Sequence, residues 1–238
     1  MKKVVIILQA RTGSARLPKK VLLPTQDIPI LSHCIRRLKK INNDVPVIVA
    51  TSVLKQDDAV VDLARKEGVD YYRGSENDVL DRYYKVARKY KAMYIIRATG
   101  DNPFVDVSEG KRLLNEIVSG KWDYVNMIEK VNGKRLPLGV GLEAFTFDAL
   151  LKSWEKGLKT HHREHVNEYI FENINDFNIH FMSSMPENSC PDLSLSIDTP
   201  EDLQFIFELT RKLDKPLQAI TTKDLIRCWK KLCSLQRK

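Results

Sequence analysis

The chain has 238 residues, 43% of them hydrophobic, so it can bury a sizeable core and is not an intrinsically disordered protein. Lys and Arg number 39 against 31 Asp and Glu, and the formal net charge of +8 favours anionic partners such as phosphates and nucleotides. The sequence contains no apolar run of ~18 residues, the length needed to span a membrane.

The N-terminal sequence MKKVVIILQARTGS has two lysines and then a short apolar run. The run is too short for a signal peptide, and no small-residue cleavage site follows it, so we expect a mature N-terminus and a cytoplasmic protein. The four cysteines have no C-x-x-C spacing. We therefore expect free thiols, with no disulfide framework and no structural zinc site.

The first half of the chain predicts strands alternating with helices. Short apolar runs at 4–8, 45–50, 69–72 and 93–98 are typical of buried parallel strands. Apolar residues at helical spacing predict helices around 30–41, 60–64, 79–90 and 113–118, with Gly68 ending the second of them. This alternation predicts an α/β fold with a mainly parallel central sheet and helices on both faces.

The pattern changes after residue 121. Asn132-Gly133 between apolar stretches at 123–128 and 134–136 predicts a hairpin. Further strands are expected at 142–145, 179–182 and 193–197, and helices at 150–154, 166–177 and from Thr199 onward, where Thr-Pro-Glu-Asp is typical of a helix start. We expect one domain over 1–238, with a hairpin-bearing insertion at 121–180 and a basic C-terminal helix at 222–238.

The loop at 9–20 carries the most informative residues. It follows the first predicted strand and contains the cations Arg11, Arg16, Lys19 and Lys20. Small residues at 13–14 let the backbone approach a ligand and present amide groups to phosphates. Ligands of parallel sheets bind at this end of the strands, so we favour a phosphate site over a solvated basic loop. The loop lacks the Walker A pattern.

Two aspartates follow predicted strands and are candidate metal ligands. Asp101 stands between Gly100 and Pro103, and Asp198 precedes the helix that starts at Thr199. Carboxylates together with phosphates are the ligands that Mg²⁺ prefers. Taken alone, Asp101 fits a turn equally well, and capping the helix is the favoured role of Asp198.

The segment 161–165 contains H-x-x-E-H, an inverted zinc-peptidase pattern with His161 and His165 one helical turn apart. No third ligand is evident downstream, so an acceptor-binding or structural role is favoured over zinc. Paired cations at 36–37, 39–40, 230–231 and 237–238 leave nucleic-acid binding as an alternative. It is disfavoured, because no recognition motif with interleaved aromatic residues accompanies them.

Five sequence blocks occur in order along the chain: QARTGSARLPKKVL at 9–22, RGSENDVLDRY at 73–83, RATGDNP at 97–103, REHV at 163–166 and IDTPEDL at 197–203. Together they resemble the spore-coat polysaccharide cytidylyltransferase-like proteins, which are relatives of the acylneuraminate and 3-deoxy-manno-octulosonate (Kdo) cytidylyltransferases. The resemblance spans about residues 4–207.

The resemblance implies a nucleotide-diphospho-sugar transferase fold and a homodimer paired through the insertion. It also implies a reaction in which an acceptor oxygen attacks CTP to give a CMP-sugar and pyrophosphate. Arg16, Lys20 and Asp101 would be catalytic, and Asp101 and Asp198 would hold Mg²⁺. Nucleotide-binding residues would be Ala10, Arg11, Gly13, Ser14, Arg16, Lys20, Arg73, Asp78, Arg82 and Thr99. Glu143, Arg163 and His165 would contact a small anionic or sugar acceptor.

The sequence departs from the family pattern in two places. Lys19 replaces a common Gly, and Leu138 and Gly141 replace a cation and an acid in a block that would meet the acceptor. These departures concern the acceptor more than the nucleotide. Two other functions are kept as alternatives: a glycosyltransferase of the same fold that uses a nucleotide-sugar donor, and a non-enzymatic nucleotide- or RNA-binding protein.

Overall fold

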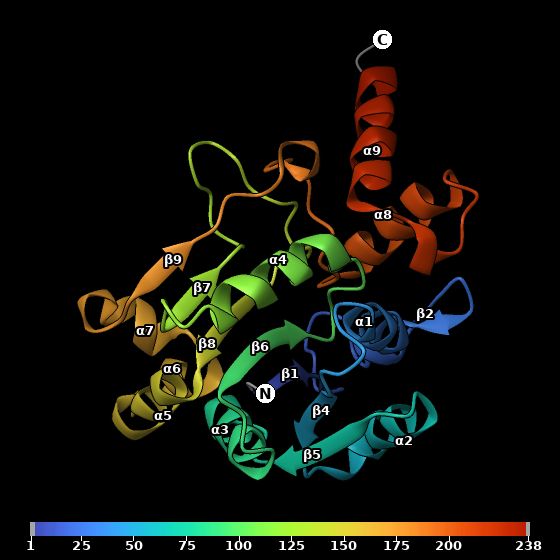
Figure 1. Cartoon of the computed structure of the whole chain (residues 1–238). Coiled ribbons are helices and arrows are strands. Elements are labelled where there is room, and N and C mark those ends of the chain that lie inside the picture. Colours follow the sequence, from blue (N-terminus) through green and yellow to red (C-terminus); the bar gives the residue numbers. More distant parts are fainter. Residues whose placement is uncertain (1–2, 237–238) are drawn as a thin grey trace.

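The computed structural model describes residues 3–236, and its centre is a seven-stranded sheet (Figure 1). The strand order is β5-β4-β1-β6-β8-β7-β9, and only β8 runs against its two neighbours. The sheet is therefore mainly parallel, as predicted. Its strands are β1 Val4–Gln9, β4 Val47–Ser52, β5 Asp70–Gly74, β6 Tyr94–Thr99, β7 Tyr124–Asn126, β8 Glu143–Thr146 and β9 Ile179–Phe181. A small separate ribbon pairs β2 Pro24–Thr25 with β3 Ile28–Pro29.

Helices cover both faces of the sheet because the strands are apolar on both sides. In β1, Ile6 and Leu8 belong to one core cluster and Val5 and Ile7 to the other, which is the period-two alternation of a strand. The first face is covered by α1 Ile30–Lys39, α2 Asp58–Lys66, α4 Val107–Val118, α8 Pro200–Arg211 and α9 Thr222–Gln236. The second is covered by α3 Val79–Lys89, α5 Phe147–Lys156 and α7 Glu168–Glu172.

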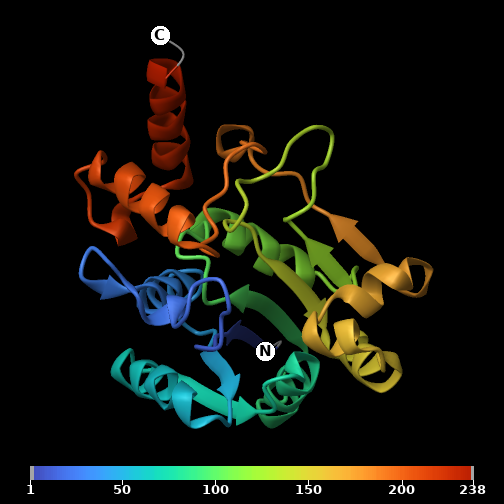
Figure 2. The same ribbon diagram turned by 180° about the vertical axis from the view of Figure 1, so that it is seen from behind.

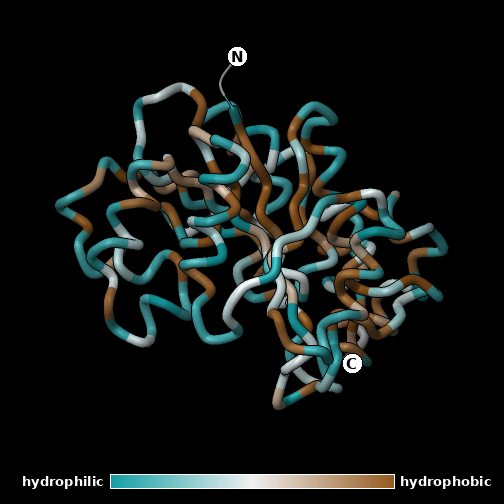
Figure 3. The backbone as a smooth tube through the Cα atoms, turned by 90° about the horizontal axis from the view of Figure 1, so that it is seen from below, coloured by the Kyte–Doolittle hydropathy of each residue, from teal (hydrophilic) through white to brown (hydrophobic). Residues whose placement is uncertain are grey.

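Figures 1 and 2 show this layering from opposite sides, with the C-terminal helix α9 projecting beyond the rest of the molecule. In Figure 3 the most hydrophobic stretches of the backbone lie in the central strands, and hydrophilic colours dominate the outer loops. Short helices complete the chain: α6 Thr160–Glu164 and the 3₁₀ turns η1 Lys20–Leu22, η2 Lys55–Asp57, η3 Ile174–Asp176, η4 Pro186–Asn188 and η5 Leu217–Ala219.

Several local signals in the sequence are confirmed. Gly68 follows α2 with a φ of 65°, the left-handed conformation that glycine adopts most easily. Thr199 caps α8 in a capping box with Asp202. The described cysteines are free thiols, and Cys34, Cys190 and Cys228 are buried. Within residues 3–236, no helix is long and apolar enough to cross a membrane.

Three predictions about the second half are wrong. The turn at Asn132-Gly133 forms, but only one bridge, between Val131 and Lys134, flanks it, because β8 and β9 occupy both edges of β7. The stretch 193–197 makes a single bridge through Ser194 in place of a strand. The helix expected over 166–177 is reduced to α7 followed by η3. The basic C-terminal helix reaches Gln236, and the last two residues of its predicted range lie outside the described residues.

Candidate functional site

A pocket of about 410 Å³ opens where β1 and β6 end, at the carboxyl edge of the parallel strands. Its walls come from the loop after β1, the turn after β6, the start of α3, the end of α6 and the segment before α8. Most of the predicted site residues line it: Ala10, Arg11, Gly13, Ser14, Arg16, Lys20, Arg82, Thr99, Asp101, His165 and Asp198. The rule that ligands bind beyond the strand ends therefore locates this cavity correctly.

The two candidate metal ligands meet at one lysine. Lys20 Nζ donates to Asp101 Oδ2 and to Asp198 Oδ1, each at 2.7 Å. Burial alone would lower the pKa of Lys20, but the negative charge of Asp101, with hydrogen bonds to both carboxylates, outweighs it and raises the pKa. Lys20 is therefore a fixed positive charge between two acids that lie far apart in the sequence.

Arg16 adds a second cation to the same cluster. Its Nη2 atom lies 3.1 Å from Asp198 Oδ1, and two-thirds of the side chain (66%) is exposed. Because exposed arginines are free to reorient, Arg16 can turn from the carboxylate toward a bound anion. The pocket thus combines two carboxylates, which suit a divalent cation, with cations that suit phosphate groups.

A buried carboxylate holds the loop after β1 in place. Thr12 donates to Asp57 Oδ1 through both its backbone N and its hydroxyl, each at 2.7 Å, and Ser52 donates to the other carboxylate oxygen. Thr12 O in turn accepts from the amides of Ser14 and Lys19 at 2.9 and 3.0 Å. Asp57 therefore links the end of β4 to the turn of the loop. The strand-end rule that found Asp101 also applies to Asp57, which sequence reasoning missed.

Lys19 has a φ of 57°, a left-handed conformation that disfavours a side chain with a β-carbon. The departure from glycine at this position thus places a strained residue in the loop. The strain is tolerated because the Lys19 amide donates to Thr12 O and the Lys19 carbonyl accepts from Leu22 N, which holds the backbone of this residue at both ends.

Replacing Asp57 by Asn is expected to destabilise the protein by ~1–3 kcal/mol and to raise the KM for nucleotide, because a buried anion that accepts three hydrogen bonds loses its charge.

Burial alone would raise the pKa of Asp57, but the hydrogen bonds from Ser52 and Thr12 outweigh it and lower the pKa below 3.8. Its contribution to stability is therefore present above pH 3.8 and is lost as the pH falls through the lower, folded-state pKa. Denaturant unfolding at pH 7 and pH 3 measures this.

Asp58→Asn is the matched control, since Asp58 is adjacent in sequence but half exposed (51%) in its pair with Arg73. Such surface pairs contribute only ~0–1 kcal/mol. Equal effects of the two substitutions on stability and KM would contradict the positioning role of Asp57.

Arg82 lines the pocket from α3 although its residue is only 1% exposed. Its Nη1 atom donates to the backbone carbonyls of Ser75 and Glu76, and its Nε has no hydrogen-bond partner among residues 3–236. Burial lowers the pKa of Arg82. A guanidinium with an unused donor beside a cavity is a candidate to bind a polar group of a ligand.

Four predicted site residues do not line the pocket. Arg73 donates to Asp58 at 2.6 Å and to two backbone carbonyls. Asp78 caps α3 and accepts a two-pronged pair from Arg163, at 2.9 and 2.7 Å. Glu143 is only 1% exposed and binds Arg97, Tyr124 and Asn167. The predicted contact of Glu143 with an acceptor has no exposed surface to use, because this carboxylate is occupied inside the fold.

The histidine segment divides between two places. His165 and Glu164 line the pocket, and Glu164 lies 3.9 Å from Arg11. His161 turns away and contacts Glu172. The two histidines of the inverted zinc-peptidase pattern therefore do not share a cluster of ligands in the described part of the chain. Lining residues that sequence reasoning did not name are Gln9, Ala15, Val21, Val79, Gly100 and Glu164.

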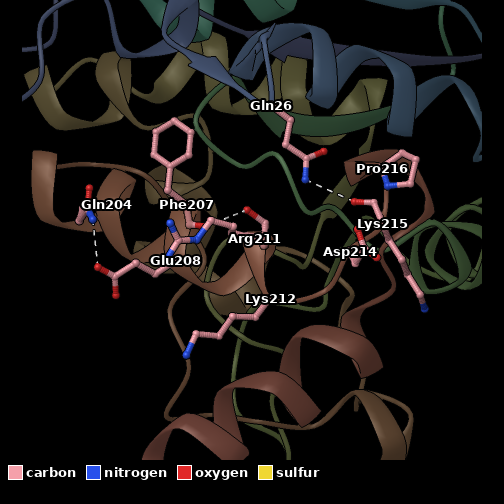
Figure 4. Close-up of a pocket in the computed structure, with 10 residues that line it drawn as sticks. Gln26, Gln204, Phe207, Glu208, Arg211, Lys212, Asp214, Lys215 and Pro216 are labelled. Atoms are coloured by element: carbon pink, nitrogen blue, oxygen red, sulfur yellow. Dashed lines mark hydrogen bonds between the residues drawn. The ribbon is translucent and has the colours of Figure 1, made fainter.

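A second and larger pocket, of about 750 Å³, lies away from the strand ends (Figure 4). Gln26 of the turn between β2 and β3 borders it on one side and donates to the carbonyl of Lys215, while α8 and the following turn supply Phe207, Arg211 and Asp214. Acidic and basic side chains both line it, and no strand of the central sheet, within residues 3–236, ends there. Size alone therefore does not identify the functional cavity.

A mainly parallel α/β sheet with a cationic loop and two converging aspartates in a pocket at the carboxyl edge of its strands suits a nucleotidyltransferase. The chain matches the sequence profile described as Cytidylyltransferase over residues 5–228. It belongs to this cytidylyltransferase family, which confirms the class suggested by the sequence blocks.

Similar proteins agree with this assignment. The spore coat polysaccharide biosynthesis protein SpsF of Bacillus subtilis is 34% identical over 217 residues, which are 89% of this chain and 88% of that protein. A solved cytidylyltransferase from Leptospira borgpetersenii superposes with a TM-score of 0.89 at 30% identity, covering 98% of this chain and 96% of that one. The solved CMP-2-keto-3-deoxy-manno-octonic acid synthetase, in complex with CTP, shares the fold, with a TM-score of 0.67 at 20% identity over 89% and 99% of the two chains.

Proposed function

We propose that this enzyme transfers CMP from CTP to a sugar acid or a related acceptor, with Mg²⁺, and releases pyrophosphate. The observation that carries the proposal is the contact of Lys20 with both Asp101 and Asp198 beside a cationic loop. The names of the relatives support surface polysaccharide synthesis as its purpose and CTP as its nucleotide. A cytoplasmic location and a homodimer stay predictions.

In the proposed reaction, an acceptor oxygen attacks the α-phosphorus of CTP. One oxygen–phosphorus bond forms, the bond from the α-phosphorus to the bridging oxygen breaks, and pyrophosphate carries away the bond's electron pair. Lys20 and Arg16 offset negative charge on the triphosphate and the leaving group. The bonds of Thr12 with Asp57, Ser14 and Lys19 fix the shape of the loop that carries these cations, which keeps the cations positioned for the phosphates. Such a transfer needs no protein nucleophile.

The acidic pair fits Mg²⁺ by its chemistry. Two carboxylates face one cation, the ammonium of Lys20, so this part of the site already accommodates a positive charge between oxygen donors. Asp101 and Asp198 would hold the ion. When bound, Mg²⁺ would neutralise phosphate charge and increase the electrophilicity of the α-phosphorus.

The test is pyrophosphate release from CTP, ATP, GTP and UTP, each with Mg²⁺ and a panel of sugar acids. We expect release with CTP and at least one acceptor, and none without acceptor or with EDTA. Equal turnover of the four nucleotides would overturn the CTP assignment.

The two alternative functions give different results in the same assay. A glycosyltransferase would consume a nucleotide sugar and release no pyrophosphate. A nucleic-acid-binding protein would show no turnover, and its affinity for RNA would fall steeply with salt.

A further inference from the structure

A cluster of two histidines and one glutamate lies outside the nucleotide pocket, where α6 packs against α7 (Figure 1). His161 Nε2 lies 2.6 Å from one carboxylate oxygen of Glu172, and His162 Nε2 lies 3.0 Å from the other. One nitrogen from each ring and one oxygen of the carboxylate lie within 4.8 Å of one another. Three ligand atoms of the kinds that bind transition metals therefore converge on one point.

His162 is the fixed member of the cluster. Its side chain is only 4% exposed, and its ring packs edge-on against Tyr169 with the centroids 5.5 Å apart. The second ring nitrogen, Nδ1, has no hydrogen-bond partner among the described residues. Packing against Tyr169 and the contact of Nε2 with Glu172 thus hold the ring. A pre-positioned imidazole is what a metal site requires of its ligand.

The other two members can adjust. His161 is 45% exposed and Glu172 is 36% exposed, so each can move toward an ion while water fills the open coordination positions. In a tetrahedral site with bonds of ~2.0–2.2 Å the ligand atoms lie about 3.4 Å apart. The two nitrogen–oxygen pairs, now at 2.6 and 3.0 Å, must therefore open slightly to admit an ion. The exposed side chains allow that movement without displacing the buried ring.

Lys159 is the competing cation. Its Nζ lies 2.7 Å from Glu172 Oε2, and 62% of its side chain is exposed. Lys159, His161 and His162 all contact this one carboxylate. The carboxylate thus already attracts positive charge, and Lys159 can leave to solvent.

We propose that His161, His162 and Glu172 bind a late first-row transition dication such as Zn²⁺. Two imidazole nitrogens and one carboxylate suit Zn²⁺, whereas Mg²⁺ prefers oxygen ligands alone. The site is separate from the aspartate pair and is independent of the proposed reaction. Because α6 continues directly into Glu164 and His165 of the pocket, a metal that joins α6 to α7 would stiffen that wall of the nucleotide site.

The test is a titration of the metal-free protein with Co²⁺, followed by displacement with Zn²⁺. We expect visible absorption of a four-coordinate Co²⁺ centre, one equivalent per chain, that Zn²⁺ abolishes. Loss of a residue that hydrogen-bonds to a metal ligand typically weakens metal binding by ~10–100-fold. Glu172→Gln removes a ligand itself and should therefore weaken Co²⁺ binding by more than that. His161→Gln, at an exposed position, tests the same ligand set if Glu172→Gln fails to fold.

Matched variants separate this site from other histidines and from the aspartates. Lys159→Gln should tighten binding, because it removes the competing ammonium. His180→Gln, at a histidine that stacks on Trp122, and Asp101→Asn should leave the Co²⁺ affinity unchanged. Binding that survives both Glu172→Gln and His161→Gln, or no binding at all, would overturn the proposal and leave the cluster as an ion-pair network around Glu172.

Discussion

Replacing Asp101 by Asn is expected to lower CTP-dependent pyrophosphate release by ~10²–10³-fold or more. Because Asn has nearly the same size as Asp, the loss of activity measures the contribution of the negative charge. The amide attracts a divalent cation less than a carboxylate does, and it does not balance the charge of Lys20. The same substitution at Asp198 should have a similar effect, because both acids contact the same ammonium. Steady-state kinetics at saturating CTP and Mg²⁺ measure kcat, and unfolding curves check that the fold is retained.

Asp62→Asn is the control for this prediction. Asp62 lies on the surface of α2, where its side chain is 73% exposed in a pair with Arg65, and its loss should leave kcat unchanged. A kcat for Asp101→Asn within a factor of two of the wild type would mean that this carboxylate has no part in the reaction. The proposed site would then have to be abandoned.

The location of the site could be predicted because it depends on local pattern and strand direction. Buried runs such as 4–8 and 93–98 predict parallel strands, parallel strands end at one edge, and the polar residues after them therefore meet. The contact of Asp198 with Lys20 is different. Its segment forms no strand, and only the resemblance to a family indicated that the two would come together.

The predicted site residues that lie away from the pocket are those whose charges are paired inside the fold. Asp78 and Arg163 look like polar site residues in the sequence, but they pair with each other. A sequence shows which residues are charged and not which of them already have partners, because pairing depends on contacts between distant segments. The hairpin fails for the same reason: Asn132-Gly133 specifies a turn, whereas competition among β7, β8 and β9 decides which strands pair.

Glu143 is the centre of a buried network that joins β6, β7, β8 and the start of α7. Arg97, Tyr124 and Asn167 all donate to its carboxylate. Burial alone would lower the pKa of Arg97, but the charge of Glu143 outweighs it and raises the pKa. Burial and the same negative charge raise the pKa of Tyr124. The carboxylate thus balances the buried cation and accepts the hydrogen bonds around it.

Glu143→Gln is therefore expected to lower the free energy of unfolding by ~3–5 kcal/mol, since it leaves the Arg97 guanidinium buried without a counter-charge. Guanidinium chloride unfolding measures this loss. Arg97→Met should be costly as well, and the double variant should cost less than the sum of the two, because the second substitution removes a charge that the first left unpaired. The exposed Glu208→Gln, whose partner is Gln204, is the matched control and should change stability by less than ~0.5 kcal/mol.

The same variant distinguishes a supporting role from contact with the acceptor. If Glu143 only holds the sheet together, Glu143→Gln that remains folded at low temperature should keep the wild-type KM for the acceptor while its unfolding midpoint falls. If Glu143 touches the acceptor, the KM for the acceptor should rise and stability should stay near that of the wild type. The second result would support the contact between Glu143 and the acceptor that the sequence predicts. Because Glu143 is only 1% exposed in this structure, such a contact would require the buried network to open during the reaction.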